Sequence, residues 1–379
     1  MPSYIHDLPD WPGFVWDNGH LAAALATARH LQGRLLGRME ALGFKVREET
    51  VLLTLTEDVL KSSEIEGEAL DAGQVRSSVA RRLGIDAGGL QASDRHVEGV
   101  VEMMLDATQH YDQPLTDERL FGWHASLFPT GRSGMHRIVV GAWRDDRAAP
   151  AFARCATADK PMQVVSGPVG RERVHFEAPA AGRLGEEMRR FLEWFNTDAA
   201  LEPVLKAALA HLWFVTIHPF DDGNGRIARA IADMSLARSE GSSQRFYSMS
   251  AQIREERAQY YRILEQTQQG ALDVTPWMEW FLGCLTRAIE GAQAALAAVI
   301  AKTRRREQLR DVPLNERQRL VIGKLLEGFE GKLTTSKWAA LTKSSNDTAL
   351  RDIQQLVERG VLVRNAAGGR CTSYSLAGL

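Results

Sequence analysis

The amino-acid sequence predicts a mainly α-helical protein with one β-hairpin near its middle and a small, separate unit at its C-terminus. Apolar residues recur every three or four positions through most of the 379 residues, which is the spacing of amphipathic helices. Alternating apolar and polar residues flank the Gly-Pro-Val-Gly of residues 167–170, a pattern typical of a hairpin. From Asn315 onward, three helical patterns precede two short strand patterns.

These patterns divide the chain into four parts. A helical N-terminal region covers residues 1–110, and a second, mostly helical region covers residues 111–300. A charged stretch that ends in a proline, residues 301–313, indicates a linker. Residues 314–379 then form the C-terminal unit.

The order of elements in the C-terminal unit is that of a winged helix-turn-helix domain. Its third helix directs Ala349, Ile353 and Val357 inward and Arg351 outward. The segment from Asn315 carries ten Lys and Arg against six Asp and Glu, although the whole chain has a net charge of −2. This mild basic tilt leaves DNA open as a partner. Protein binding or a homodimer is equally compatible with such a unit.

Composition excludes several classes of protein. The near-neutral charge argues against binding of nucleic acid or membrane by the whole surface. Three widely spaced cysteines without CxxC spacing indicate neither a disulfide framework nor a zinc site. No apolar run approaches membrane-spanning length, and no signal-peptide pattern is present. We therefore expect a cytoplasmic protein that does not enter a membrane.

Residues His218 to Arg229 read HPFDDGNGRIAR and carry the strongest chemical signal in the chain. The run joins two helix-like stretches and combines a histidine that can take a proton, an acidic pair that can hold a hard cation, and glycines that admit an anion. The N–H groups that begin the second helix favour negative charge, and Arg226 and Arg229 share one of its faces. The run is neither a Walker A loop nor a dinucleotide-binding fingerprint. It predicts phosphate chemistry.

This run is similar to HPFx(D/E)GNGRxxR, the signature of the Fic family, and matches it at every fixed position. The N-terminal strings DLPDWPGFVWD and SSEIEGEALD are similar to a bacterial subgroup of that family with a C-terminal winged helix. The resemblance implies a Fic-type helical core with a β-hairpin flap. It also implies transfer of AMP from ATP, with Mg²⁺, to a Ser, Thr or Tyr hydroxyl of a target protein or of the protein itself. Removal of AMP from a modified protein, and a DNA-binding regulator whose core senses nucleotide, remain open.

The resemblance gives each matched position a role. His218 corresponds to the general base that takes the hydroxyl proton, and Asp222 to the magnesium ligand. Tyr260 and Tyr261 resemble a pair that lies near the nucleotide, with core packing an equal alternative. The residues that correspond to phosphate-binding positions are Gly223, Asn224, Gly225, Arg226 and Arg229.

A second motif lies far upstream, where Ser62, Glu66 and Gly67 fit (S/T)xxxE(G/N). In the family this string is inhibitory when it precedes the catalytic core. The resemblance implies that Glu66 contacts Arg229 and occupies the place that the γ-phosphate needs. The protein is therefore expected to inhibit itself.

The hairpin corresponds to the flap on which targets of Fic proteins dock. Its strands are predicted at Met162 to Gly167 and Arg171 to Glu177, and a target backbone could add to the open edge. A hairpin that only caps the core is the alternative. The stretch from Asp145 to Lys160 is longer than the subgroup leads us to expect, so it either alters target choice or is a neutral loop. The predicted docking residues are Met162, Gln163, Val164, Val165, Val174, His175 and Phe176.

Overall fold

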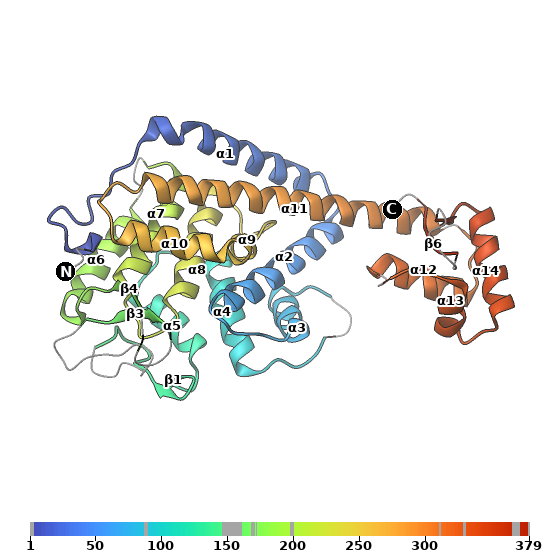
Figure 1. Ribbon diagram of the computed structural model, residues 1–379, viewed down its shortest axis with the longest axis horizontal. Coiled ribbons are helices and arrows are strands. Elements are labelled where there is room, and N and C mark those ends of the chain that lie inside the picture. Colours follow the sequence, from blue (N-terminus) through green and yellow to red (C-terminus); the bar gives the residue numbers. More distant parts are fainter. Residues whose placement is uncertain are drawn as a thin grey trace. The chain divides into compact units, whose positions relative to one another are not determined.

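In the computed structural model the chain folds mainly into α-helices, as its periodicity predicts (Figure 1). Its described residues fall into two compact units, Met1–Gln293 and Ala294–Leu379. Among them, no helix combines the length and the apolar character that crossing a membrane requires. Residues 146–160 of the predicted insert lie outside the described residues, so the role of this insert stays a prediction. The structure describes residues 4–86, 90–145, 161–167, 171, 173–197, 201–310, 312–328, 331–365 and 372–377.

The first unit contains the predicted N-terminal region and residues 111–293 of the second helical region. Helix α11 (Thr275–Arg310) begins in this unit and continues past its boundary. Its other helices are η1 (Ile5–Asp7), α1 (Asn18–Glu40), α2 (Phe44–Ile65), α3 (Ala72–Leu83), α4 (Arg95–Gln109), α5 (Asp117–Leu127), η2 (Ala181–Arg183), α6 (Leu184–Asn196), α7 (Pro203–Ile217), α8 (Asn224–Glu240), α9 (Met249–Glu255) and α10 (Arg257–Gln268). Its strands are β1 (Arg132–Ser133), β2 (His136–Arg137), β3 (Gln163–Ser166) and β4 (Arg173–Glu177).

Helices α7 and α8 pack against each other and flank the candidate loop, as the sequence predicts. From Val204 to Ile217, every residue of α7 except Lys206 is buried. A helix that is apolar on all sides belongs in the centre of a fold. The start of α7 is well defined, because Glu202 accepts hydrogen bonds from the N–H groups of Val204 and Leu205 at 2.8 and 3.0 Å. Helices α2, α4, α5 and α9 contact α8 and complete the surroundings of the loop.

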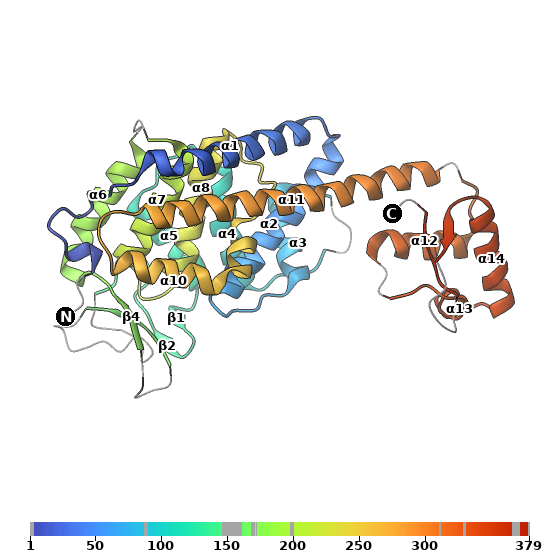
Figure 2. The same cartoon turned by 45° about the horizontal axis from the view of Figure 1, so that its top comes forward.

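Helix α1 and the first part of α11 run side by side along one side of the first unit (Figures 1 and 2). Arg34 of α1 donates from Nη2 to Oε1 of Gln293 at 2.6 Å. The indole of Trp277 anchors α11 on α7 by donating to the carbonyl of Ala208 at 2.8 Å. Further along α11, Cys284 is a buried free thiol, while Cys155 and Cys371 lie outside the described residues.

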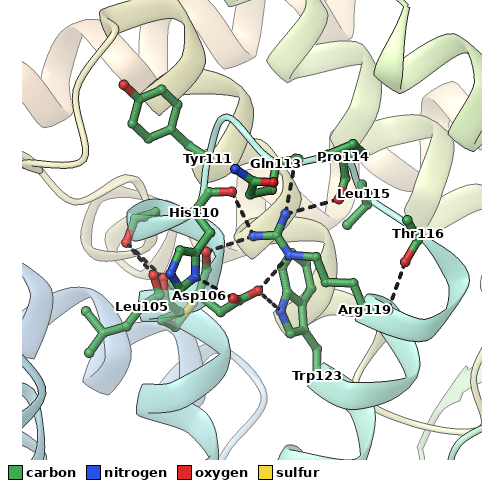
Figure 3. Close-up of polar contacts among 12 residues, drawn as sticks. Leu105, Asp106, His110, Tyr111, Gln113, Pro114, Leu115, Thr116, Arg119 and Trp123 are labelled. Atoms are coloured by element: carbon green, nitrogen blue, oxygen red, sulfur yellow. Dashed lines mark hydrogen bonds and ion pairs between the residues drawn. The ribbon is translucent and has the colours of Figure 1, made fainter.

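The carboxylate of Asp106 fixes the corner between α4 and α5 (Figure 3). It accepts hydrogen bonds from Nε of Arg119 and Nε1 of Trp123, both at 2.7 Å, and contacts Nδ1 of His110 at 2.8 Å. Burial opposes ionisation of Asp106, but the hydrogen bonds from Arg119 and His110 outweigh it, and its pKa is lowered. This corner holds α5 in place, and α5 carries His124 to the candidate loop.

The predicted hairpin is present as the antiparallel pair β3–β4, with an irregularity between Val164 and Val165. Met162 and Phe176 are buried in a small cluster with Tyr4 and Ala178. They therefore anchor the hairpin to the first unit, and the docking role that we predicted for these two residues is corrected.

The remaining predicted docking residues lie closer to the surface. Val164 and Val174 are exposed, whereas Gln163, Val165 and His175 are half-buried. Gln163 donates from Nε2 to Glu177 at 2.9 Å, and Nδ1 of His175 lies 2.9 Å from Glu265. Strand β3 pairs with β4 alone among the described residues, so its outer edge has no strand partner there.

In the second unit, three helices precede an antiparallel strand pair, which confirms the predicted order of elements. Its core contains Trp338, Ile353 and Leu356. Ala349 and Ile353 face inward as expected, but Val357 is exposed and Leu356 is buried instead. The assignment to the winged helix class stays a prediction. The elements are α12 (Glu316–Gly328), α13 (Thr335–Thr342), α14 (Asn346–Glu358), β5 (Leu362–Arg364) and β6 (Tyr374–Leu376).

The predicted linker at 301–313 differs from the structure. Residues 301–310 continue α11, and the boundary between the two units falls inside this helix, between Gln293 and Ala294. The stretch consists largely of Arg, Lys, Glu, Gln and Leu, which are good helix formers, and no proline occurs before Pro313. High charge in a sequence therefore does not by itself indicate a linker.

Candidate active site in the loop between α7 and α8

The run from His218 to Arg229 lies where α7 ends and α8 begins. Helix α7 ends because His218 adopts a left-handed conformation, with φ 53° and ψ 57°. Gly223 is also left-handed, with φ 83°, and directly precedes α8. A side chain at position 223 would be strained and would also collide with the ring of Phe128. These two residues fold the chain back between the two packed helices.

His218 is held in the form that a general base needs. Its Nδ1 lies 3.2 Å from the carbonyl oxygen of Val215, which can only accept, so this nitrogen carries the proton. Nε2 is then left as an acceptor. Burial, together with the nearby charge of Arg144, lowers the pKa of His218 to about 4. The imidazole is therefore neutral at physiological pH.

Arg144 ties the hairpin to the candidate loop. Its side chain is buried and donates from Nε to the carbonyl of His218 at 2.9 Å and from Nη2 to the carbonyl of Pro179 at 2.5 Å. Its backbone N–H donates to Pro219 at 2.9 Å. Since Pro179 directly follows the hairpin, one guanidinium links the base of the flap to the backbone of the proposed base.

The loop is closed from within by Asn224. Its Nδ2 donates to the carbonyl of Phe220 at 2.7 Å, and its Oδ1 accepts from the N–H of Phe220 at 3.0 Å. The amide therefore braces the loop in this structure, and the phosphate-binding role that we expected for Asn224 stays a prediction. The backbone around Gly223 and Gly225 and the two arginines are the other predicted parts of the anion site.

The two aspartates of the loop point to different partners. Asp221 is buried and accepts from the N–H of Val139 at 2.8 Å, which makes it structural. Asp222 is half-buried and accepts from Oγ of Ser133, in β1, at 2.5 Å. Beneath it, His124 of α5 stacks on Phe220 with ring centroids 4.2 Å apart. Nε2 of His124 donates to the carbonyl of Asp222 at 3.2 Å.

Only one carboxylate of the loop is thus placed for a metal. Among the described residues, no group of three or more His, Cys, Asp or Glu could hold a metal ion. Mg²⁺ is often held by one or two carboxylates together with substrate phosphates and water. Asp222 therefore fits magnesium that arrives with a nucleotide better than a resident metal centre.

The start of α8 offers donors to an anion. Gly223 provides no side-chain cap, so the first N–H groups of the helix keep the positive end of its dipole open. Arg226 and Arg229 follow on one face, and both are about 1% exposed. Each has one buried donor without a partner among the described residues, Nε of Arg226 and Nη1 of Arg229. Unpaired buried donors are costly, and a bound phosphate would satisfy them.

The upstream motif contacts Arg229 as the resemblance implies. Nε of Arg229 donates to Oγ of Ser62 at 2.9 Å, and Nη2 donates to the carbonyl of Ser62 at 2.9 Å. Nη2 also lies 2.8 Å from Oε1 of Glu66. Gly67 follows in a left-handed conformation, with φ 85°, and ends α2 at this point. All three residues of the motif therefore shape this contact.

Gly225 admits Glu66 to the start of α8. A methyl group at position 225 would collide with Oε1 of Glu66 and would lie 3.3 Å from Nη1 of Arg229. The glycine that we expected to face phosphate therefore faces a carboxylate of the same protein in this structure. A carboxylate and a phosphate oxygen suit the same donors, so the two compete for this place.

The two tyrosines separate into core and surface. Tyr260 is buried, and its hydroxyl lies 2.9 Å from Nε2 of His211, so it belongs to the core. Tyr261 is 41% exposed, and its hydroxyl donates to the carbonyl of Ile65 at 3.4 Å. Tyr261 is thus the tyrosine that remains available to a nucleotide beside the end of α2.

Four residues that contact the loop or its arginines were not found by sequence reasoning. They come from segments without a motif, and each acts through a contact that the fold creates. The exception is Glu68, which lies inside the string SSEIEGEALD, directly after the inhibitory motif. These residues are Glu68, His124, Ser133 and Arg144.

Comparison with known protein families finds two matches along the chain. Residues 114–236, which contain the whole candidate loop, match the Fic/DOC family. Residues 4–85, which contain the Ser62–Gly67 motif, match a domain of unknown function, DUF4172.

Similar curated proteins are named protein adenylyltransferase Fic. The protein from Drosophila mojavensis is 26% identical over 231 residues, which cover 60% of this chain and 39% of that protein. The protein from Drosophila grimshawi is 34% identical over 114 residues, which cover 30% of this chain and 22% of that protein. The chain thus matches less than half of the length of these relatives.

Solved structures agree in fold. A Fic family protein from Desulfovibrio desulfuricans G20 aligns with a TM-score of 0.51 at 19% identity, over 94% of this chain and 96% of the other. A Fic domain containing signaling protein from Bacteroides thetaiotaomicron VPI-5482 aligns with a TM-score of 0.50 at 22% identity, over 72% of this chain and 97% of the other. The match over the loop shows that residues 114–236 of this chain are a Fic/DOC domain, and the likeness to the solved structures shows a shared fold.

Proposed function

We propose that this protein transfers AMP from ATP to a hydroxyl side chain of a target protein. One observation carries the proposal: a single loop holds a neutral histidine, and the helix that follows presents two buried arginines with unpaired donors. A base and an anion site are the two things that nucleotidyl transfer to a hydroxyl requires. The curated relatives named protein adenylyltransferase Fic support the choice of reaction.

In the proposed reaction, the target hydroxyl oxygen attacks the α-phosphorus of ATP. The bond from this phosphorus to the oxygen that bridges to the β-phosphate breaks, and pyrophosphate leaves. Nε2 of His218 takes the hydroxyl proton, a role typically worth ~10²–10⁴ in rate. The backbone at the start of α8 faces the α-phosphate, and the guanidinium groups of Arg226 and Arg229 balance the charge on the departing pyrophosphate.

Magnesium fits this site through Asp222. When bound, Mg²⁺ would neutralise phosphate charge and orient the chain of phosphates. Asp222 would hold the ion, because its carboxylate lies in the loop and the phosphates supply further oxygen ligands. The hydroxyl of Ser133 restrains this carboxylate by a hydrogen bond.

The hairpin is the proposed docking surface for the target. The outer edge of β3 can accept the backbone of an extended segment, and Val164 and Val174 offer exposed apolar contacts beside it. Arg144 connects the base of this hairpin to His218, so docking and catalysis share one rigid support. Which protein is modified would then depend on how well its own residues contact this hairpin.

In the structure described here, Glu66 holds Arg229, and we propose that this state is self-inhibited. The ion pair occupies donors that the γ-phosphate would otherwise use. Nucleotide then binds productively only in the fraction of molecules in which the contact is broken.

The test uses ATP labelled at either end of the phosphate chain. The parent and the variant Glu66→Gly are incubated with Mg²⁺ and with α-labelled or γ-labelled ATP, alone and with cell lysate. Label on protein from the α-position only supports the proposal. Label from the γ-position indicates a kinase, and no label on protein from the α-position in either variant contradicts AMP transfer.

Two further measurements distinguish the alternatives, one on a pre-modified target and one on DNA. Loss of AMP from a pre-modified target that depends on Glu66 favours the reverse reaction. Salt-dependent binding to DNA without any transfer favours a DNA-binding regulator.

A further inference from the structure

The turn that carries Glu66 brings a second carboxylate to the arginine pair. Oε2 of Glu68 lies 2.6 Å from Nη1 of Arg226. The turn is fixed by the left-handed Gly67 and by the N–H of Glu68, which donates to the carbonyl of Ser63 at 3.0 Å. Because Arg226 and Arg229 are three residues apart on one helix, the two glutamates contact one continuous face of α8.

Arg226 is a buried cation that needs an anionic partner. It is buried, and its guanidinium carbon lies 5.2 Å from the centre of the Phe128 ring. Glu68 supplies its one ion-pair partner among the described residues, while Nε stays without a hydrogen bond. A buried guanidinium needs such a partner because it has lost its water. Any phosphate that binds Arg226 must therefore share or displace Glu68.

Glu68 is itself held in its charged form. Nε2 of His96, in the first turn of α4, lies 3.3 Å from the same Oε2 atom that faces Arg226. Burial opposes ionisation of Glu68, but the hydrogen bond from His96 and the charge of Arg226 outweigh it, and its pKa is lowered. The contact is therefore a three-membered cluster that joins the end of α2 to α4 and α8.

We propose that Glu68 is a second inhibitory carboxylate, which competes with nucleotide phosphate for Arg226 as Glu66 competes for Arg229. The regulatory meaning of this proposal rests on the proposed function, whereas its claim about nucleotide binding does not. Arg226 is two residues from Asn224, where α8 begins, and Arg229 lies about 4.5 Å further along the helix. With the α-phosphate at the loop, Arg226 therefore meets the nearer of the two following phosphates. Glu68 should thus oppose binding of both di- and triphosphates, and Glu66 mainly that of triphosphates.

The test measures nucleotide affinity without any transfer. The α,β-methylene analogues of ADP and ATP cannot release AMP. Calorimetry measures their binding, in the presence of Mg²⁺, to the parent and to four variants. Glu68→Gln should bind both analogues about fivefold more tightly, a change in keeping with a partly exposed ion pair. Glu66→Gly should favour the triphosphate analogue over the diphosphate analogue.

Glu64→Gln is the matched control, since it removes a glutamate from the same helix end. Glu64 pairs with Lys61 at 2.9 Å and with Arg254 at 3.4 Å, and it should leave both affinities unchanged. Glu68→Ala repeats the test without an amide that could still accept from Arg226, and it should bind at least as tightly as Glu68→Gln. Parental affinity for both analogues in the two Glu68 variants would overturn the proposal.

The two proposals fail in different ways. If the affinities change as expected but no variant transfers α-label to protein, the proposed function fails and the competition at Arg226 stands. If Glu66→Gly transfers label while neither Glu68 variant changes affinity, the function stands and Glu68 is only a structural link between α2, α4 and α8.

Discussion

His218 shows how a backbone conformation and a side-chain role are linked. Its left-handed conformation ends α7 and directs Nδ1 to the carbonyl of Val215. A non-glycine residue in this conformation costs of order 1 kcal/mol, so the surrounding contacts must hold it there. Arg144 provides one such contact through the carbonyl of His218. The same guanidinium charge disfavours protonation of the ring and thereby helps to keep the imidazole neutral.

The neutral state of His218 gives a prediction at the residue scale. Because burial and Arg144 lower its pKa to about 4, the imidazole should stay unprotonated from pH 7.5 down to about pH 5. The measurement is the proton NMR titration of the His218 ring in the free protein, with the signal identified by its loss in His218→Ala. An inflection near pH 6.5 would show an unperturbed histidine and contradict this account.

The variant His218→Ala should lose transfer of label and keep its affinity for nucleotide.

The sequence predicted the residues of the loop, but it did not predict the residues from other segments that hold the loop in place. The residues from His218 to Arg229 are adjacent, so a motif and its chemistry could be read together, and the pairing of Glu66 with Arg229 came from the family resemblance. Arg144 and Ser133 lie 74 and 89 residues from their partners in the loop. Contacts of this kind depend on how helices pack, and no local pattern encodes them. The contact of Asn224 with Phe220 was not predicted, because a side chain suited to an anion is equally suited to a backbone amide.

At the scale of elements, the end of α2 brings two carboxylates to the arginines of α8, and the proposed self-inhibition depends on it. The helix stops at Glu66 because Gly67 reverses the chain, and the reversal places Glu66 and Glu68 on α8. Neither the helix propensity of the residues in α2 nor its apolar face requires this turn. The geometry of the turn follows from the left-handed conformation of Gly67.

Gly67→Ala should therefore weaken both carboxylate contacts. Alanine at φ 85° costs roughly 1 kcal/mol, which the chain can relieve by moving Glu66 and Glu68 away from the arginines. We expect faster transfer of label than in the parent and a slightly lower melting temperature. Gly84→Ala is the control, because Gly84 ends α3 in the same conformation, with φ 67° and open space around it. Equal rates in the two variants would mean that the turn at Gly67 has no special role.

The elements themselves were largely predictable, with two instructive exceptions. The hairpin and the helices around the loop follow from their periodicity. Residues 301–310 read as a linker because they are charged, yet charged residues with good helix propensity continue α11. In the hairpin, Met162 and Phe176 are apolar residues of a two-stranded element, and the sequence could not show that its buried face packs on Tyr4.

At the scale of the whole molecule, buried neutral histidines link stability to pH. Burial lowers the pKa of His211 to about 3 and that of His124 to about 4. Both values lie below the ~6.5 of an unfolded histidine, so the unfolded chain takes up protons first as pH falls. Stability is thus full above pH 6.5 and is lost progressively between pH 6.5 and these values. Each histidine contributes a slope of about 1.4 kcal/mol per pH unit.

His211→Gln tests this linkage. The variant should be less stable than the parent at neutral pH, because His211 fills a buried site beside Tyr260. Its free energy of unfolding should nevertheless fall less steeply with acid, by about 1.4 kcal/mol per pH unit between pH 6 and 4.5. Denaturant unfolding at a series of pH values measures both slopes. Parallel curves for parent and variant would show that His211 is not neutral in the folded state.

We propose that the end of α2 and the start of α8 form one switch, in which Glu66 restrains Arg229 and thereby AMP transfer. Initial rates of label transfer from α-labelled ATP, at one Mg²⁺ concentration, are compared for the parent, Glu66→Gly, Arg229→Ala and the double variant. We expect Glu66→Gly to be about tenfold faster or more, which corresponds to at least ~1.4 kcal/mol of preference for the restrained state. Arg229→Ala and the double variant should stay slow, since they lose a phosphate contact. A rate in Glu66→Gly that equals or falls below that of the parent would contradict the account.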